Sequence, residues 1–349
     1  MTSEIRQLAD RLIKEHHLLR EEYALLIDSR DEESAKYLAD AAVAVRKKYY
    51  GNKVFVRGLI EISNICKNDC KYCGIRRSNK ACERYRLTEE EILACADEGY
   101  RLGLHTVVMQ GGEDGHFTDE VLCELIRKIK AQHPDCAVTL SLGERSRESY
   151  AKLKEAGADR YLLRHETADP EHYAMLHPAE MSFDNRMRCL RDLKDLGYQT
   201  GCGFMVGSPY QTTQHLAKDI QFIEEFKPEI CGIGPFIPHH ETEYANEPAG
   251  SVELTCFLLS IIRLVHPRVL LPATTALGTM HPQGRELGIL AGANVLMPNL
   301  SPVGVRKKYE LYDNKIRTGE ESAQCIRCLA TRVEAIGYEI EVGRGDFCP

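Results

Sequence analysis

The sequence predicts an α/β protein: a (β/α)8 TIM-type barrel with helices before it and a short helical extension after it. Two observations lead to this prediction. From residue 53 onward, short β-rich runs alternate with amphipathic helical stretches, the pattern of repeated βα units and a parallel sheet. Eight such units fit between residues 53 and 300, a length that suits one closed barrel. We therefore expect one compact unit, with an N-terminal helical segment over 1–52 packed on the barrel, the barrel over 53–300 and the extension over 301–349.

The chain before the barrel is predicted to form three helices, over residues 5–19, 21–28 and 32–50. In the third, Leu38 and Ala42 recur at helical spacing on one face, and charged residues occupy the other. This pattern predicts that the segment packs one face against the rest of the protein.

The barrel region contains eight β-rich runs with helical stretches between them. Thr88 and Glu91 form a capping-box pattern at the start of one helix, and Thr118 opens the next. Glycines stand where helices are expected to end before a strand, at Gly157, Gly197 and Gly292. The expected strands span residues 54–63, 105–110, 137–142, 160–164, 199–206, 230–235, 269–275 and 295–298.

The composition is that of an ordinary globular protein. The chain has 349 residues, a formal net charge of -7 and a pI near 6.0, so no generic affinity for nucleic acid or an anionic membrane is expected. The N-terminus is polar, and no uninterrupted apolar stretch is long enough to span a bilayer. We expect a cytoplasmic protein with neither nucleic acid nor membrane as partner.

Fourteen cysteines are many for a chain of this length. A secreted disulfide framework would normally come with a signal peptide and a short chain, and this sequence shows neither. Metal–thiolate chemistry in a reducing cytosol fits better. Most of the cysteines are expected to be packed thiols in helices and strands, namely Cys82, Cys95, Cys123, Cys136, Cys189, Cys202, Cys231 and Cys256.

Three cysteines directly after the first predicted strand are spaced for an iron–sulfur cluster. Cys66, Cys70 and Cys73 can fill three corners of a 4Fe–4S cube. The fourth iron is then open, as one position is open on a catalytic zinc, and the amino and carboxylate groups of S-adenosylmethionine can chelate it. A structural zinc loop is the alternative, but it needs a fourth ligand, and no histidine or cysteine follows within the loop. Tyr72 should place an aromatic ring beside the cluster.

Further candidates lie at the ends of the other predicted strands, where chemistry gathers in this fold. Glycines there let backbone carbonyls approach an ammonium group closely, and an arginine beside a glutamate offers both charges to one zwitterionic ligand. Each signal alone is weak, because such residues are common in surface loops. The candidates are Gly111, Gly112 and Glu113 after strand two, Ser141 and Glu144 after three, Arg164 and Glu166 after four, Met205 and Gly207 after five, and Thr274 and Thr275 after seven.

Arg57 is a charged residue among the hydrophobic residues of strand one. A buried charge is costly unless it is paired, so we expect Arg57 to point into the barrel only if an anionic group lies there. The alternative is an outward arginine that caps a neighbouring helix.

The cysteine loop, the Gly-Gly-Glu turn and the eight βα units resemble the radical S-adenosylmethionine (SAM) superfamily, in its biotin synthase-like branch. Longer strings are similar to the HydE family of FeFe-hydrogenase maturases, from about residue 45 to 330. They are L-S-L-G-E (140–144), A-G-A-D-R-Y-L-L-R-H-E-T-A (156–168), G-I-G-P-F-I-P-H (232–239), P-A-T-T-A-L-G-T (272–279), A-N-V-L-M-P-N (293–299) and the stretch around Arg57.

The resemblance implies an enzyme that cleaves SAM at a 4Fe–4S cluster to a 5′-deoxyadenosyl radical and acts in assembly of the diiron subcluster of FeFe hydrogenase. The substrate would be a small cysteine-ligated iron complex made by HydG, or a sulfur-containing ligand. The product would pass to HydF, and a ferredoxin or flavodoxin would supply electrons. By position, Glu166 and Arg186 would hold the ribose and carboxylate of SAM, and the turn at 111–113 its amino group. The implied substrate cavity consists of Arg57, Arg164, Thr274, Thr275 and Tyr309.

The C-terminal cysteines depart from the family pattern. Some members carry a second cluster on a cysteine followed eight residues later by C-x-x-C. Here Cys325 and Cys328 form the C-x-x-C, but the upstream position is Arg317, and Cys348 could help only if the tail folds back. We expect a second cluster to be absent or partial; the alternative is two reduced thiols that open a helix.

Three other functions stay open at this point. A related radical enzyme could rearrange a free amino acid, as methylornithine synthase does. A biotin synthase-like enzyme could insert sulfur, although no residue marks a sulfur-donor cluster. A non-catalytic metal-binding scaffold would produce no deoxyadenosine from SAM and reductant.

Overall fold

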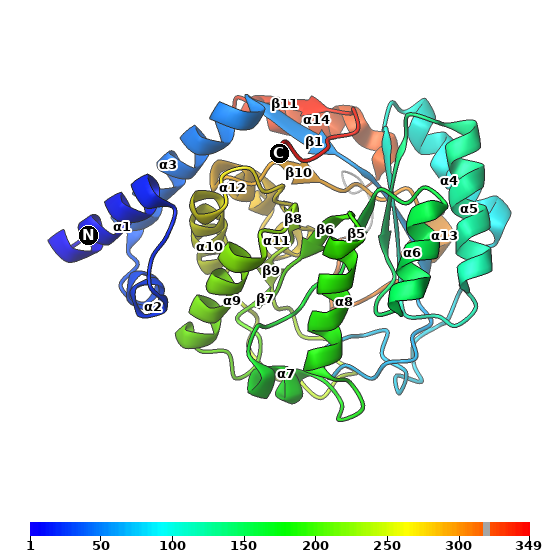
Figure 1. Cartoon of the computed structure of the whole chain (residues 1–349), viewed down its shortest axis with the longest axis horizontal. Helices are drawn as coiled ribbons and strands as arrows, with labels where there is room; N and C mark the ends of the chain where they lie inside the picture. Colours follow the sequence, from blue (N-terminus) through cyan, green and yellow to red (C-terminus); the bar gives the residue numbers. More distant parts are fainter. Residues whose placement is uncertain (317–321) are drawn as a thin grey trace.

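A ring of parallel strands forms the centre of the protein, whose computed structural model describes residues 1–316 and 322–349 (Figure 1). The strands are β1 Lys53–Val56, β2 Gly58–Ser63, β3 Thr106–Gly111, β4 Ala137–Ser141, β5 Arg160–Leu162, β6 Gln199–Cys202, β7 Met205–Val206, β8 Ile230–Cys231, β9 Gly234–Pro235, β10 Val295–Leu296 and β11 Glu339–Glu341. Six of them pair in the order β2-β3-β4-β5-β6-β8. β1 precedes β2 in the first strand of the ring and pairs with β10.

The ring closes through a short extended segment. Parallel bridges join Ile230 to Leu270 and Pro272 to Val295, so this segment connects β8 to β10. With β7 and β9 continuing the fifth and sixth strands, the predicted (β/α)8 barrel is confirmed.

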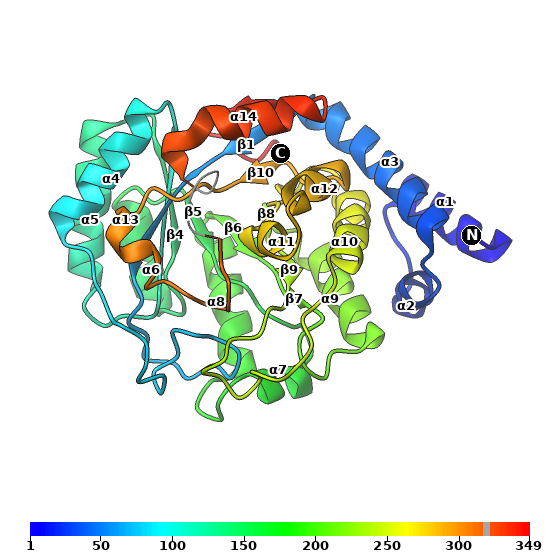
Figure 2. The same cartoon turned by 180° about the vertical axis from the view of Figure 1, so that it is seen from behind.

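Helices surround the ring, as Figure 1 and the reverse view in Figure 2 show. The helices are α1 Ser3–Glu15, α2 Arg20–Asp28, α3 Glu32–Tyr50, α4 Glu89–Arg101, α5 Asp119–Gln132, α6 Arg147–Glu155, α7 Pro170–Leu176, α8 Phe183–Asp195, α9 Thr213–Phe226, α10 Val252–Val265, α11 Thr275–Met280, α12 Gly284–Leu290, α13 Val303–Arg306 and α14 Ile326–Ala335, with a 3-10 turn at Ala323–Cys325. α3 packs against α10 and α2 against α9, so the N-terminal helices lie on the helical layer of the barrel.

Local signals in the sequence are reproduced at the helix ends. Thr88 accepts a hydrogen bond from the Glu91 N–H, and the Glu91 side chain accepts one from the Thr88 N–H. The three glycines expected after helices all have positive φ, at 116° for Gly157, 76° for Gly197 and 109° for Gly292.

The prediction of eight uninterrupted strands is wrong in detail. Residues 269–275 make only the two bridges, because Pro272 lacks an N–H and α11 begins at Thr275. The fifth strand breaks at Gly203, where φ is 154° and a Cβ would lie 2.0 Å from the Gly232 carbonyl oxygen. At Gly203 the backbones of the fifth and sixth strands therefore lie too close for a side chain, and the regular pairing of these strands is interrupted.

The C-terminal extension closes the N-terminal end of the barrel. α14 is helical as predicted, but β11 then pairs in parallel with β1. Beyond β11, the Arg344 carbonyl accepts hydrogen bonds from Thr106 at 2.8 Å and from Arg160 at 2.7 Å, two residues of barrel strands. A three-residue strand is too short to show the alternation by which strands are predicted, so sequence periodicity does not reveal this closure.

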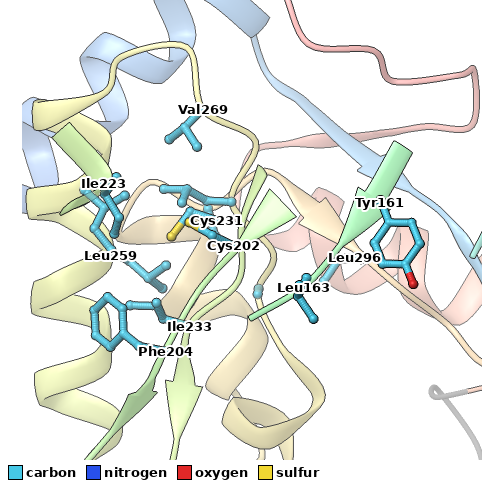
Figure 3. Close-up of a cluster of buried hydrophobic side chains, with 14 of the residues drawn as sticks. Tyr161, Leu163, Cys202, Phe204, Ile223, Cys231, Ile233, Leu259, Val269 and Leu296 are labelled. Carbon is cyan, nitrogen blue, oxygen red and sulfur yellow. The ribbon is translucent and has the colours of Figure 1, made fainter. Parts of the chain in front are cut away.

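Six of the eight cysteines expected as packed thiols are buried, and Cys82 and Cys256 are half-buried. Figure 3 shows Cys202 and Cys231 among apolar side chains of the strands and of α9 and α10. The two are register partners on β6 and β8. Within the described residues, no helix is both long and apolar enough to cross a membrane.

Candidate functional site

The three spaced cysteines lie in the long connection between β2 and α4, at the C-terminal end of the first strand. All three side chains are half-buried. The Glu113 N–H points at Cys66 Sγ over 3.4 Å. At Gly112 a Cβ would lie 2.3 Å from the Ile65 carbonyl oxygen, so only glycine lets the second strand's end pack this closely on the cysteine loop.

Burial disfavours the thiolate forms of these cysteines in the metal-free protein. Burial raises the pKa of Cys66, that of Cys73 to about 12, and that of Cys70 well above its ordinary value. Each of the three also experiences the negative charge of at least one neighbouring cysteine or glutamate. A cationic cluster would reverse this balance, because metal binding displaces the thiol protons.

A cluster of charged residues from the third and fourth strand ends lies beside the thiols. Arg186 on α8 donates to Glu144 at 2.6 Å and to the Arg164 carbonyl at 2.5 Å. The charges of Arg186 and Glu166 both act on the Cys70 thiol, so this group adjoins the cysteine loop. Neighbouring negative charge, of Glu144 among others, raises the pKa of Arg186 despite burial.

Arg164 and Glu166 keep unused hydrogen-bonding capacity. Arg164 Nη2 lies 3.3 Å from Glu166 Oε2, but the two atoms are not aligned for a hydrogen bond. Both atoms, and Arg164 Nε, are buried without a hydrogen-bond partner among the described residues. Glu166 also has a φ of 67°, a strained backbone conformation for this residue. Buried polar atoms of both signs that pair only with each other and make no hydrogen bond within the described residues indicate a ligand that carries both charges.

An apolar patch also adjoins the cysteine loop. Tyr72 packs against a buried group on the fourth, fifth and sixth strand ends, which consists of Leu176, Met205, Phe236 and Tyr244. Gly207 has a φ of 74°, and a Cβ there would lie 2.6 Å from Gly250. A flat, uncharged group such as an adenine ring suits this patch.

Glu113 does not offer a free carboxylate. It accepts a hydrogen bond from the Glu144 N–H at 2.9 Å and pairs with Lys67 at 3.0 Å. An ammonium group at this turn would therefore meet the backbone of Gly111 and Gly112. Ser141, the last residue of β4, is half-buried at the same rim.

The residues predicted to line a substrate cavity lie at two levels of the barrel. Thr274 and Arg164 are at the rim, and the Thr274 hydroxyl is buried without a hydrogen-bond partner in the described part of the chain. Thr275 starts α11 beside it. Tyr309 is 2% exposed and its hydroxyl lies 3.4 Å from Gln110 Nε2. Arg57, by contrast, lies at the opposite end, where it donates to the Gly345 carbonyl at 3.1 Å.

Sequence reasoning missed a buried ion pair next to Tyr309. Glu61 on β2 is fully buried, pairs with Lys315 and accepts a hydrogen bond from Asn299 at 2.9 Å. The signal that singled out Arg57 was available for Glu61 too, since it is a charged residue four positions later in the same apolar strand and therefore on the same face. Nothing in the sequence indicated Lys315, which lies 254 positions away.

Cys325 and Cys328 are joined to each other by a disulfide at the start of α14. Cys348 is exposed, and its N–H donates to the Tyr50 hydroxyl at 3.3 Å. Arg317 lies outside the described residues. In this state neither cysteine of the C-x-x-C offers a thiolate to a second cluster.

Known proteins are similar to this chain in both sequence and fold. Residues 60–223 match the family described as the radical SAM superfamily. The FeFe hydrogenase maturase subunit HydE of Thermotoga maritima is 47% identical over 315 residues, which cover 90% of this chain and 89% of that protein. The chain belongs to the HydE family of radical SAM enzymes. It is accordingly an enzyme that uses a 4Fe–4S cluster and S-adenosylmethionine.

More distant relatives of the family cover the same length. The 3-methylornithine synthase of Methanosarcina barkeri is 29% identical over 96% of this chain and 94% of its own. The crystal structure of methylornithine synthase superposes with a TM-score of 0.83 at 27% identity, and covers 96% of this chain and 97% of that one. A crystal structure of HydG, at 21% identity and a TM-score of 0.81 over 98% of this chain and 77% of that one, shares the fold.

The residues present fit these two cofactors. The cysteine loop supplies three sulfur ligands and no fourth, which leaves one iron of a cube open. Arg164 and Glu166, which form an ion pair with each other, supply atoms of both signs beside it that have no hydrogen-bond partner in the described part of the chain. The patch around Tyr72 supplies an apolar wall.

Proposed function

We propose that this enzyme acts in assembly of the diiron subcluster of FeFe hydrogenase, on a small cysteine-ligated iron complex or a sulfur-containing amino-acid-like ligand. The observation that carries the proposal is the 47% identity to a hydrogenase maturase over nearly the whole chain. The chamber supports it, because its unpaired polar atoms suit a small ligand with carboxylate and amino groups.

In the proposed reaction, Cys66, Cys70 and Cys73 hold the cluster. Glu166 and Arg186 position SAM, with the backbone at 111–113 at its amino group and Ser141, Glu144, Met205 and Gly207 around it. When bound, the cluster and SAM supply the 5′-deoxyadenosyl radical. Burial of Tyr72 and its apolar neighbours excludes water from the place where that chemistry occurs.

The remaining chamber residues would bind the substrate. Arg164, Thr274, Thr275 and Tyr309 lie near the cofactor side, where a guanidinium and hydroxyls can hold a carboxylate. Arg57 offers positive charge deeper in the barrel, and its Nε and Nη1 have no hydrogen-bond partner among the described residues. An anionic ligand group, such as a carboxylate or cyanide, would meet this charge.

The proposal implies particular partners. HydG would supply the iron complex, HydF would receive the product, and a ferredoxin or flavodoxin would reduce the cluster, all in the cytoplasm. The surface of the cysteine loop carries Lys71 and Arg77; Arg77 is 57% exposed and pairs with Glu180 at 3.2 Å. Positive charge there suits an acidic electron donor.

Rearrangement of a free amino acid is the second candidate function. It is favoured by the full-length superposition on methylornithine synthase. The two functions differ in their substrate: a maturase would leave lysine unchanged, whereas the second candidate would convert it to methylornithine.

The deciding experiment is anaerobic maturation of FeFe hydrogenase with HydG and HydF but without HydE. Addition of this protein should restore hydrogen production, and its Cys70→Ala variant should not. A parallel incubation with lysine, SAM and reductant, followed by mass spectrometry for methylornithine, tests the second candidate. Deoxyadenosine formation without either product would leave the enzyme class intact and reject both substrates.

A further inference from the structure

A segment of the C-terminal extension crosses the rim of the barrel. It comprises residues 307–316, which leave α13 and are drawn in orange up to the grey trace in Figure 2. We call these residues the strap. The strap contacts the cysteine loop, because the Gly74 N–H donates to the Leu311 carbonyl at 2.8 Å and Asn64 Nδ2 to the Lys308 carbonyl at 2.7 Å.

The other contacts of the strap are with the sixth and seventh strand ends. The Asp313 N–H donates to the Pro238 carbonyl at 3.1 Å, and the Asp313 carboxylate accepts from the His240 N–H at 3.0 Å. The Ile316 N–H donates to Thr279 Oγ1 at 3.3 Å. The strap therefore spans the rim from the first strand to the sixth and seventh strand ends, beside the predicted chamber.

One strong interaction fixes the strap to the barrel wall itself. Lys315 is 8% exposed and pairs with Glu61, which is 0% exposed. The second Glu61 oxygen accepts from Asn299 Nδ2 at 2.9 Å, so both carboxylate oxygens are satisfied. Loss of the lysine would leave the Glu61 carboxylate buried without the opposite charge of Lys315, which is strongly destabilising.

The same lysine holds Tyr309. Lys315 Nζ donates to the Tyr309 carbonyl at 3.0 Å and lies 4.7 Å from the centre of the Tyr309 ring. Tyr309 in turn reaches Gln110 at the end of the second strand. Glu61 thus fixes the position of a chamber residue through Lys315.

We propose that the strap is the closing element of the chamber and that Glu61 and Lys315 are positioning residues that place Tyr309 when it closes. The proposal deepens the proposed function and rests on it for the nature of the substrate, a small ligand with carboxylate and amino groups. With the strap open, Tyr309 leaves the wall and the ligand can pass. With the strap closed, the ion pair completes the wall before the radical is formed.

Lys315→Met removes the cation, and Lys308→Met is the matched control. Lys308 lies in the same strap, but it pairs with Glu83, which is 73% exposed. Hydrogen exchange of the holoenzyme should speed up at least tenfold at the Asp313 and Ile316 amides in Lys315→Met, with the amides of β3 unchanged. In the maturation assay this variant should lose at least tenfold of the hydrogenase activity, and Lys308→Met should stay within twofold of the parent.

Two further variants separate positioning from folding. Glu61→Gln with Lys315→Met leaves no unpaired buried charge, so the barrel should be as stable as the parent while the strap amides still exchange fast. Lys315→Arg keeps the cation and should restore protection and activity at least in part.

Unchanged exchange in the strap of the double variant would overturn the proposal. So would equal effects of Lys308→Met and Lys315→Met, or faster exchange throughout the barrel of the double variant. If the parent enzyme supports no maturation, the proposed substrate fails, whereas the exchange measurements still test the strap.

Discussion

Replacement of Arg57 by methionine should stabilise the fold and impair the reaction. Arg57 is 0% exposed and makes one hydrogen bond, to the Gly345 carbonyl. Its Nε and Nη1 are buried without partners in the described residues, and burial holds the pKa of the guanidinium well below its ordinary value. Loss of the hydrogen bond should lower the free energy of unfolding by about 1 kcal/mol. Removal of the two unsatisfied N–H groups should raise it by about 1–3 kcal/mol each. The free energy of unfolding should therefore rise by about 1–5 kcal/mol.

Arg263 is the matched control for this prediction. It is also 0% exposed, but its side chain donates to Gly292 at 3.1 Å, Pro267 at 2.9 Å and Asn294 at 3.1 Å. Arg263→Met removes three satisfied hydrogen bonds and should lower the free energy of unfolding by about 3 kcal/mol.

The assay is anaerobic urea unfolding of both variants and the parent, together with the maturation assay. Arg57→Met should raise the free energy of unfolding, and Arg263→Met should lower it. Arg57→Met should also lose maturation activity, because a destabilising residue that a protein retains commonly serves its function. A destabilised Arg57→Met protein would refute the reasoning. It would mean that the guanidinium contributes to the fold, as Arg263 does.

Three further predictions concern the cysteine loop and its surroundings. Cys70→Ala should abolish the absorption band at roughly 400 nm after anaerobic reconstitution, because two thiolates do not hold a cubane; a retained band would contradict the cluster assignment. Gly112→Ala should lower cluster content with little loss of barrel structure, as measured by iron per chain and circular dichroism, since the added Cβ would displace the Ile65 carbonyl. His177 is 1% exposed, and its Nε2 lies 3.2 Å from the Tyr72 hydroxyl of the cysteine loop. Burial lowers the pKa of His177 to about 3, so between pH 6.5 and 3 the unfolded chain binds the proton more readily and stability falls with falling pH. From pH 7 to 5 the loss should be about 2 kcal/mol in the cluster-free protein, and His177→Gln should remove that part of the pH dependence.

Some of the site was predictable because its signals are local. The spacing of Cys66, Cys70 and Cys73 is a property of eight consecutive residues. The ends of parallel strands in a barrel meet at one rim, so Arg164 and Glu166 could be expected there once the strands were counted. Gly112 and Gly203 can be identified in the sequence, but the backbone atoms that require glycine there lie in other segments, at Ile65 in the cysteine loop and at Gly232.

Other parts were not predictable, because they depend on which distant segments meet. Glu61 and Lys315 are 254 positions apart, and neither residue indicates that the other will neutralise it. The partner of Arg57 is a backbone carbonyl near the C-terminus, and a carbonyl carries no sequence signal. The expected seventh strand failed because Pro272 cannot donate a ladder hydrogen bond, so that only bridges form.

The sequence by itself determined the class of chemistry and the barrel that carries it, since both follow from short-range patterns: cysteine spacing, alternation of strands and helices, and helix caps. Tertiary structure alone decided which charges are paired inside the barrel, how the N-terminal end of the barrel is closed and which segment crosses its rim. These are long-range contacts, whose energies come from burial and desolvation of groups that only the folded chain brings together.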